Sequence, residues 1–148
     1  MTTALTELLD TNMKKVLFVC TGNTCRSPMA EAIFNNLCNK DSISFSAGIY
    51  ASEGRPVSEN SVLALSEIGL ETTHRSTLVT SEMMKEYDYV VGITKNHAEI
   101  LSQNYPEYKE KIFAFPCEVS DPYGQNLDAY KKCRDKIYNG VKAIINEL

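Results

Sequence analysis

One short segment of this chain combines a nucleophile with an anion-binding cation. Cys20 and Arg26 stand at the two ends of a C-x5-R motif in VCTGNTCRSP, residues 19–28. A thiolate can attack an electrophilic phosphorus, and a guanidinium can hold two phosphoryl oxygens through its planar fork. The C-x5-R spacing alone is weak evidence for a phosphate-binding site. Its meaning depends on the residues between Cys20 and Arg26 and on the secondary structure around them.

The residues between Cys20 and Arg26 suit an anion-binding loop. Consecutive backbone N–H groups ahead of a helix form a concave nest for an anion. Gly22 and Asn23 tolerate the unusual backbone angles that such a loop needs. The positive surroundings predict a lowered pKa for the Cys20 thiol, and Ser27 could donate a hydrogen bond to its thiolate. The predicted phosphate-binding residues are Thr21, Gly22, Asn23, Thr24, Cys25, Arg26 and Ser27.

A strand and a helix must position this loop. KVLFVC, residues 15–20, is a compact apolar run typical of a buried strand. Ser27 as the N-cap, Pro28 at the first helical position and Glu31 in the first turn predict a helix that begins directly after the loop.

The alternation of strand and helix continues to the end of the chain. We expect further strands at 42–48, 87–94 and 111–116, and further helices at 56–70, 95–104 and 127–148. This order predicts an α/β fold with a parallel sheet that is covered on both faces. If the first strand lies centrally, Cys20 stands at its carboxyl end, where open α/β sheets bind ligands.

We expect one domain at 14–148, preceded by an N-terminal extension at 1–13 that is native or left over from cloning. Met13 followed by KKVLFVC resembles a natural start. The composition is that of a globular protein, and the net charge of −4 argues against general affinity for nucleic acid or anionic membrane. Five cysteines without a secretory signal or a membrane-length apolar run favour a reducing cytoplasm.

The segment VCTGNTCRSPMAEAIF, residues 19–34, resembles the phosphate-binding loop of the low-molecular-weight protein tyrosine phosphatases, whose usual form is VCxGNICRSP. DPYG at 121–124 resembles the family segment that carries the general acid. The resemblance implies a four-stranded parallel sheet, doubly wound with helices on both faces, and a reaction without metal or cofactor. In that reaction Cys20 attacks phosphorus and Asp121 protonates the leaving group; water then hydrolyses the phosphocysteine with Asp121 as base.

The resemblance also assigns supporting roles. Asn23, Ser46 and His74 match family positions whose hydrogen bonds brace the loop, and Tyr123 could line the pocket wall. Without the resemblance, His74 is equally an ordinary loop histidine and Tyr123 a half-buried surface aromatic. We expect His97 on a helix surface. The histidines and cysteines show no metal-ligand spacing, so no metal is predicted.

The remaining cysteines have packing as their simplest role. Cys25 is the exception, because in the family this cysteine can form a disulfide with the nucleophile and so protect it from irreversible oxidation. Either role is open for Cys25 in this chain. Cys38, Cys117 and Cys133 are expected to pack in the interior.

Two departures from the family pattern bear on the substrate. Thr24 stands where the usual pattern has Ile, and Tyr123-Gly124 replaces a frequent pair of aromatics. With Thr at this position the chain resembles the bacterial protein arginine phosphatases of the family. This resemblance favours phosphoarginine slightly over phosphotyrosine as the substrate. The expected partners are therefore phosphorylated proteins, and inorganic phosphate or another oxyanion in the loop.

Two alternatives remain. Arsenate reductases share the loop, but they need further cysteines on a mobile segment, and EYDYVVGIT at 86–94 contains none. A non-catalytic phosphate-binding module would bind phosphate without turnover, although Cys20, Arg26 and Asp121 are all present.

Overall fold

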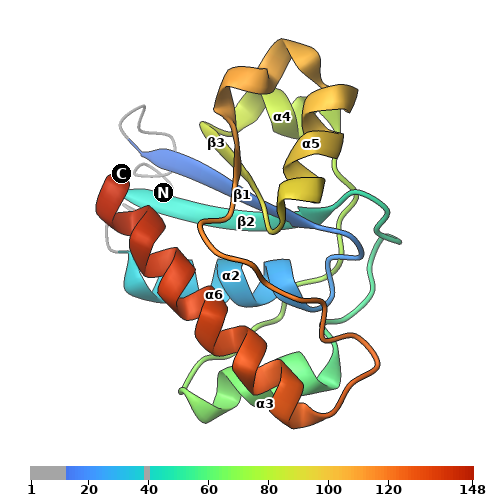
Figure 1. Ribbon diagram of the computed structural model, residues 1–148, viewed down its shortest axis with the longest axis vertical. Coiled ribbons are helices and arrows are strands. Elements are labelled where there is room, and N and C mark those ends of the chain that lie inside the picture. The colour runs from blue at the N-terminus through green and yellow to red at the C-terminus, as the bar shows by residue number, and fades with distance from the viewer. Residues whose placement is uncertain (1–12, 39–40) are drawn as a thin grey trace, which may run out of the picture.

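Four parallel strands form the centre of the computed structural model, which describes residues 13–38 and 41–148 (Figure 1). The strands are β1 (Lys14–Cys20), β2 (Ser42–Gly48), β3 (Tyr89–Gly92) and β4 (Ile112–Ala114). Their order in the sheet is β2-β1-β3-β4, and every neighbouring pair is parallel. The predicted parallel sheet is confirmed, and β1 lies inside it, so the chain reverses its direction of winding beside the carboxyl end of β1.

Helices cover both faces of this sheet. On one face lie α2 (Arg26–Leu37), α3 (Glu59–Glu67) and α6 (Leu127–Glu147), and on the other lie α4 (Ser81–Glu86) and α5 (Lys95–Asn104) (Figure 1). Alternate residues of β1 point to opposite faces, as the pleat of a strand requires. Val16, Phe18 and Cys20 join the core beneath α2 and α6, whereas Leu17 and Val19 join the core beneath α4 and α5. The doubly wound arrangement is therefore confirmed.

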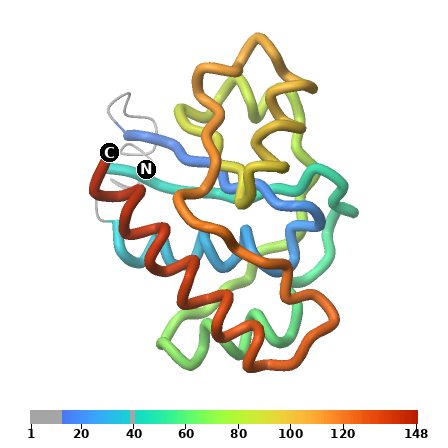
Figure 2. Tube along the Cα trace, viewed as in Figure 1, coloured from blue at the N-terminus to red at the C-terminus, as the bar shows by residue number. Residues whose placement is uncertain are grey.

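Strand β1 is a fixed platform for the loop that follows it. Phe18 is fully buried, and its ring meets those of Phe34 and Phe115 edge to face, with centroids 5.8 and 6.4 Å apart. Burying each such side chain stabilises the fold by about 1.5–3 kcal/mol. The segment that leads from β4 to α6 passes the same end of β1 (Figure 2), and Arg26 is hydrogen-bonded to it there.

The boundaries of several elements differ from the predictions. The helix expected at 56–70 begins only at Glu59, and β3 and β4 are shorter than the strands expected at 87–94 and 111–116. Helix α4 and the 3-10 turn Pro106–Lys111 were not predicted, because six residues carry too little periodicity. The predicted extension at 1–13 lies, except for Met13, outside the described residues and stays a prediction.

The start of α2 also differs. The helix begins at Arg26 with Cys25 as its N-cap, so Ser27 lies inside it and Glu31 lies beyond the first turn. The Ser27 hydroxyl does not cap the helix because it contacts the Cys20 thiol and accepts a hydrogen bond from Asn23. Among the described residues, no helix is long and apolar enough to cross a membrane.

Candidate active site

The loop between β1 and α2 has one strained residue and one unusually close neighbour. Asn23 adopts φ 58°, in the left-handed region that Asn tolerates better than most residues. Gly48 ends the neighbouring strand β2, and a Cβ there would lie 2.6 Å from the carbonyl oxygen of Thr21. Glycine at position 48 therefore lets the loop backbone lie directly against β2. Gly22 does not adopt a positive φ. The unusual backbone angle expected in this loop is therefore found at Asn23.

The Cys20 thiol is buried at the base of this loop. Its Sγ lies 2.8 Å from the Ser27 Oγ. Burial raises the pKa of Cys20, while the Ser27 hydroxyl, the Ser27 and Asn23 backbone N–H groups and the Arg26 charge lower it. The prediction of a lowered pKa is therefore wrong for this structure, because desolvation outweighs these contacts. Arg26 is the weakest of them, so most of the stabilisation available to a thiolate comes from hydrogen bonds.

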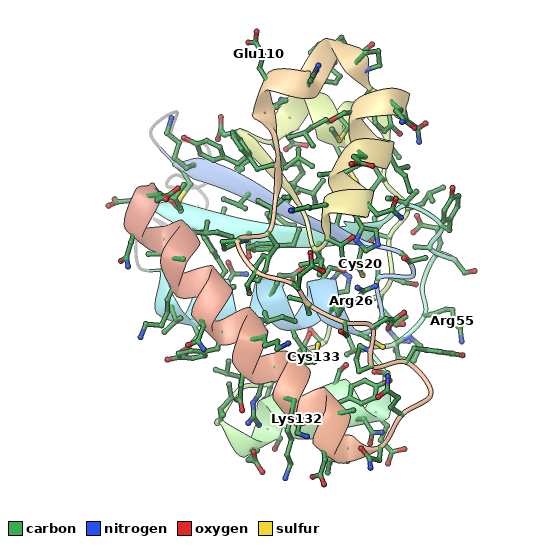
Figure 3. The ribbon with its side chains drawn as sticks, viewed as in Figure 1. Cys20, Arg26, Arg55, Glu110, Lys132 and Cys133 are labelled. Carbon is green, nitrogen blue, oxygen red and sulfur yellow. The ribbon has the colours of Figure 1, made fainter. Side chains whose placement is uncertain are left out.

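Arg26 lies beside the thiol and is 6% exposed. Its Nη1 donates to the carbonyl oxygen of Val119 at 3.1 Å, and its Nη2 lies 3.7 Å from Asp121 Oδ2. The cation is thus held by the segment that carries Asp121. Figure 3 shows Cys20 and Arg26 close together at the carboxyl end of β1. The structure therefore brings Cys20, Arg26 and Asp121 together from positions 101 residues apart in the chain.

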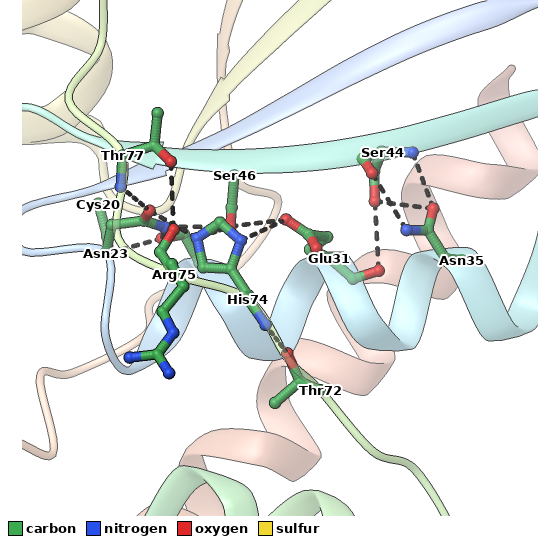
Figure 4. A network of polar contacts seen from close by, with 11 residues as sticks. Cys20, Asn23, Glu31, Asn35, Ser44, Ser46, Thr72, His74, Arg75 and Thr77 are labelled. Carbon is green, nitrogen blue, oxygen red and sulfur yellow. Dashed lines mark hydrogen bonds and ion pairs between the residues drawn. The ribbon is translucent and has the colours of Figure 1, made fainter. Parts of the chain in front are cut away.

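A buried hydrogen-bond network fixes the conformation of Asn23 (Figure 4). The side-chain amide donates to Ser27 Oγ at 2.8 Å and to Ser46 Oγ at 3.0 Å. Its Oδ1 accepts from the Thr77 backbone N–H at 2.9 Å and contacts His74 Nε2 at 2.7 Å. The Thr77 contact defines which amide atom is the oxygen, so Nε2 of His74 must be the donor.

His74 and Glu31 close this network from behind. His74 Nδ1 lies 3.4 Å from Glu31 Oε1, and the same carboxyl oxygen accepts from Ser46 Oγ at 2.8 Å. Burial lowers the pKa of His74 and raises that of Glu31. Both changes oppose ionisation, so this contact between two half-buried side chains is not a strong ion pair. Ser46 and His74 thus lie where the resemblance implied, and Glu31 is an unforeseen member.

His97 is not on a helix surface, so that prediction is wrong. It is 5% exposed, and its Nε2 lies 2.9 Å from the Thr21 Oγ1. Burial and the Arg26 charge lower the pKa of His97 to about 4, so the ring is neutral at physiological pH. Position 97 falls on the face of α5 that meets the loop, and helical periodicity alone could not assign that face.

Above the loop lies a pocket of about 290 Å³. Its lining residues are Cys20, Thr21, Gly22, Asn23, Thr24, Cys25, Arg26, Tyr50, Ser52, Arg55, Asp121 and Tyr123. The Asp121 side chain is 53% exposed, and Tyr123 is 74% exposed. Thr24 and Tyr123 both line this pocket, and their contact with a leaving group stays a prediction.

Sequence reasoning missed the wall supplied by the segment after β2. Tyr50, Ser52 and Arg55 come from this segment, and Arg55 lies on the same side of the molecule as Cys20 and Arg26 (Figure 3). Within the described residues, the Arg55 guanidinium has no hydrogen-bond or ion-pair partner. The only sequence signal was the parallel sheet, which brings the segments after β1 and β2 to one edge.

The other cysteines divide into buried and exposed. Cys25 is buried, with its Sγ 3.4 Å from Ser58 Oγ and 3.5 Å from Tyr130 Oη. Cys133 is buried and Cys38 partly buried, which confirms packing roles, but Cys117 is exposed and that prediction is wrong. A protective role for Cys25 stays a prediction. Among the described residues, no cluster of His, Cys, Asp and Glu could hold a metal ion.

A sheet with this order, and a buried thiol beside an arginine and a carboxylate at its switch point, define a cysteine-dependent phosphatase. The family described as low molecular weight phosphotyrosine protein phosphatase matches residues 15–148. A protein-arginine-phosphatase of Bacillus subtilis strain 168 is 34% identical over 143 residues, covering 90% of this chain and 95% of that protein. The chain therefore belongs to the low-molecular-weight protein tyrosine phosphatase family.

Solved structures agree on the fold and differ in the substrate that their names give. The YwlE arginine phosphatase of Geobacillus stearothermophilus has a TM-score of 0.88 at 32% identity, covering 90% of this chain and 92% of that one. The low molecular weight protein tyrosine phosphatase of T. tengcongensis has a TM-score of 0.86 at 41% identity, covering 91% and 99%. This chain is a cysteine-dependent protein phosphatase, and its similarity to both groups leaves the phosphorylated residue to be argued from the pocket.

Proposed function

We propose that this enzyme removes phosphate from phosphoarginine side chains of proteins through a phosphocysteine on Cys20. The observation that carries the proposal is the lining of the pocket above the phosphate-binding loop, which includes Thr24 and Asp121. A guanidinium leaving group is planar and carries N–H donors, and both side chains offer it oxygen acceptors. An apolar residue at position 24 would offer none.

The chemistry needs two displacements at phosphorus. The Cys20 thiolate forms an S–P bond while the P–N bond to the leaving guanidine breaks, and Asp121 gives its proton to the departing nitrogen. Water then attacks the phosphocysteine, gives a proton to Asp121 and releases the thiolate and inorganic phosphate. Arg26 and the loop N–H groups bind the phosphoryl oxygens throughout, and they stabilise the charge that develops on them.

The same wall is compatible with a second substrate. Tyr50 and Tyr123 are 72% and 74% exposed and line the pocket, so a phenyl ring could pack between them. Phosphotyrosine is therefore the competing substrate. Nothing in the wall favours arsenate reduction, because Cys25 is buried and neither the exposed Cys117 nor Cys133 lines the pocket with Cys20. We also propose a reducing compartment such as the cytoplasm, since the nucleophile must stay a thiol.

The test is a comparison of kcat/KM on matched phosphoarginine and phosphotyrosine peptides. The wild type should prefer phosphoarginine. Thr24→Ile should shift the ratio towards phosphotyrosine by about tenfold or more, since a mismatched polar or apolar contact at a pocket wall is worth roughly 10–200-fold. An unchanged ratio, or a wild type that strongly prefers phosphotyrosine, would overturn the phosphoarginine assignment.

A matched nucleophile variant tests the mechanism separately. Cys20→Ser keeps the side-chain volume close to that of the thiol but replaces the nucleophile by a hydroxyl of much higher pKa. It should fold normally and turn over neither peptide. Normal turnover by a folded Cys20→Ser protein would contradict the phosphocysteine mechanism itself.

A further inference from the structure

Thr21, the residue after the nucleophile, is held by a side chain from the face of the sheet that α4 and α5 cover. His97 belongs to α5, on the face away from α2 and α6, and its Nε2 lies 2.9 Å from Thr21 Oγ1. The Asn23 network reaches the loop from the other side, through Ser46 and His74. The phosphate-binding loop is thus braced at two points from two different parts of the fold.

His97 is itself fixed on both sides. Its Nδ1 lies 2.9 Å from the hydroxyl of Thr94, the N-cap of α5, and its backbone N–H donates to the same oxygen at 3.2 Å. The start of α5 also lies tightly against β3, because a Cβ on Gly92 would lie 2.6 Å from the Ala98 nitrogen. The ring therefore has little freedom to move towards or away from Thr21.

Thr21 connects this brace to the pocket. Thr21 lines the pocket together with Cys20, and its carbonyl oxygen accepts from the Tyr50 backbone N–H at 3.0 Å. With the side chain held by His97 and the carbonyl held by Tyr50, the peptide between Thr21 and Gly22 has a defined orientation. The N–H groups of the following residues depend on that orientation for their direction.

We propose that His97 is a positioning residue for phosphoryl binding, which acts by holding the Thr21 hydroxyl and so fixing the first turn of the phosphate-binding loop. The inference rests on the proposed function, since it assumes that this loop binds the phosphoryl group. The competing explanation is that His97 only fills space between α5 and the sheet. In that case its replacement would lower stability and leave the folded enzyme's kinetics unchanged.

Three substitutions separate these explanations. His97→Gln can place an amide near the Nε2 position and keep the contact with Thr21. His97→Asn reaches only as far as Nδ1 and keeps the contact with Thr94 alone, and His97→Leu keeps neither. We expect His97→Gln to retain most of the wild-type kcat/KM, and the other two to lose roughly 3- to 10-fold, the value of one net hydrogen bond. The inhibition constant for inorganic phosphate should rise by the same factor.

Thr21→Val completes a double-mutant cycle, because it removes the hydroxyl at nearly constant volume. Combined with His97→Leu it should cost little more than either change alone. Leu101→Ala is the matched control: this buried residue of α5 should lower the melting temperature without altering kcat/KM below it.

A wild-type kcat/KM and a wild-type phosphate inhibition constant in folded His97→Leu would overturn the inference. So would strictly additive effects in the cycle. Cys20→Ser, assayed in parallel, keeps the two questions apart: if it is inactive while His97→Leu is normal, only the role of His97 is refuted. If Cys20→Ser is active, the proposed function itself fails.

Discussion

Two loops meet at this site, and they are built in opposite ways. The loop that follows β1 is anchored by buried side chains: Asn23 and Ser27 have no exposed surface, and no buried side-chain nitrogen or oxygen of the described residues lacks a hydrogen-bond partner. The segment that precedes α6 is open to solvent, with Asp121 and Tyr123 more than half exposed. The two segments meet at Arg26, whose guanidinium donates to the Val119 carbonyl oxygen and lies 3.7 Å from Asp121 Oδ2.

The difference follows from what each loop must do. Donors that bind the phosphoryl group work best when they are already oriented, because no reorganisation is then needed as charge develops. In the proposed mechanism the general acid, Asp121, must meet a leaving group attached to a whole protein, and its position on an exposed segment allows this. That segment is held locally, since Asp121 Oδ1 accepts from the Tyr123 N–H at 3.1 Å and the Asp121 carbonyl accepts from Gln125 at 3.0 Å.

The largest expected effect comes from the exposed segment. Asp121→Asn should slow cleavage of a poor leaving group by ~10²–10⁴, the usual contribution of general acid catalysis. The melting temperature should hardly change, because surface substitutions cost about 0.5 kcal/mol or less. Single-turnover kinetics and thermal unfolding measure the two quantities. Glu118→Gln removes an exposed charge nearby and should change neither; equal losses in both variants would point to a general charge effect.

In the buried loop, activity and stability should fall together. Asn23→Ala deprives the Thr77 N–H, His74 and Ser27 of partners, and unsatisfied buried groups cost about 1–3 kcal/mol each. We expect about 3 kcal/mol lost from the free energy of unfolding, measured in urea, with a loss of kcat/KM. Asn35→Ala is the control, because it breaks a similar cluster with Ser44 that does not contact the loop (Figure 4). Its activity should remain.

Acid should act on the braces of the buried loop. Both histidines of the chain, His74 and His97, have lowered pKa values. The unfolded state therefore binds more protons below its pKa of about 6.5, and the free energy of unfolding falls as the pH drops. For His97, whose pKa is about 4, the loss between pH 6.5 and pH 4.5 is roughly 2 kcal/mol. Urea unfolding at both pH values should show a smaller drop for His97→Gln; the same drop would contradict the lowered pKa.

The smallest effect concerns the thiol. The Ser27 hydroxyl is the strongest of the contacts that lower the Cys20 pKa, so Ser27→Ala should raise that pKa further. Because the thiolate is the reactive form, the acid limb of the kcat/KM profile should move to higher pH, with the largest loss of activity in acid. Ser120→Ala, in the exposed segment, should leave the profile in place. A shift in both variants would mean that the hydroxyl of Ser27 has no special role.

The sequence by itself determined the parts that depend on neighbours in the chain. The apolar run at 15–20, the loop after it and the helix that follows were all predictable, although the helix begins at Arg26 and the prediction placed its first residue at Pro28. The motif with Cys20 and Arg26 was visible for the same reason, and its resemblance to a known family supplied Asp121.

Only the tertiary structure decided which distant residues meet the loop. His97, Arg55 and Glu31 lie 77, 35 and 11 residues from Cys20, and no periodic pattern states which face of the fold each one meets. The direction of the Cys20 pKa shift could not be predicted from the sequence either. It depends on the balance between the burial of the thiol, which raises the pKa, and the hydrogen-bond donors that reach it, which lower the pKa. Burial and contacts between distant segments are properties of the packed chain, and they arise only when the sheet brings the ends of its strands to one edge.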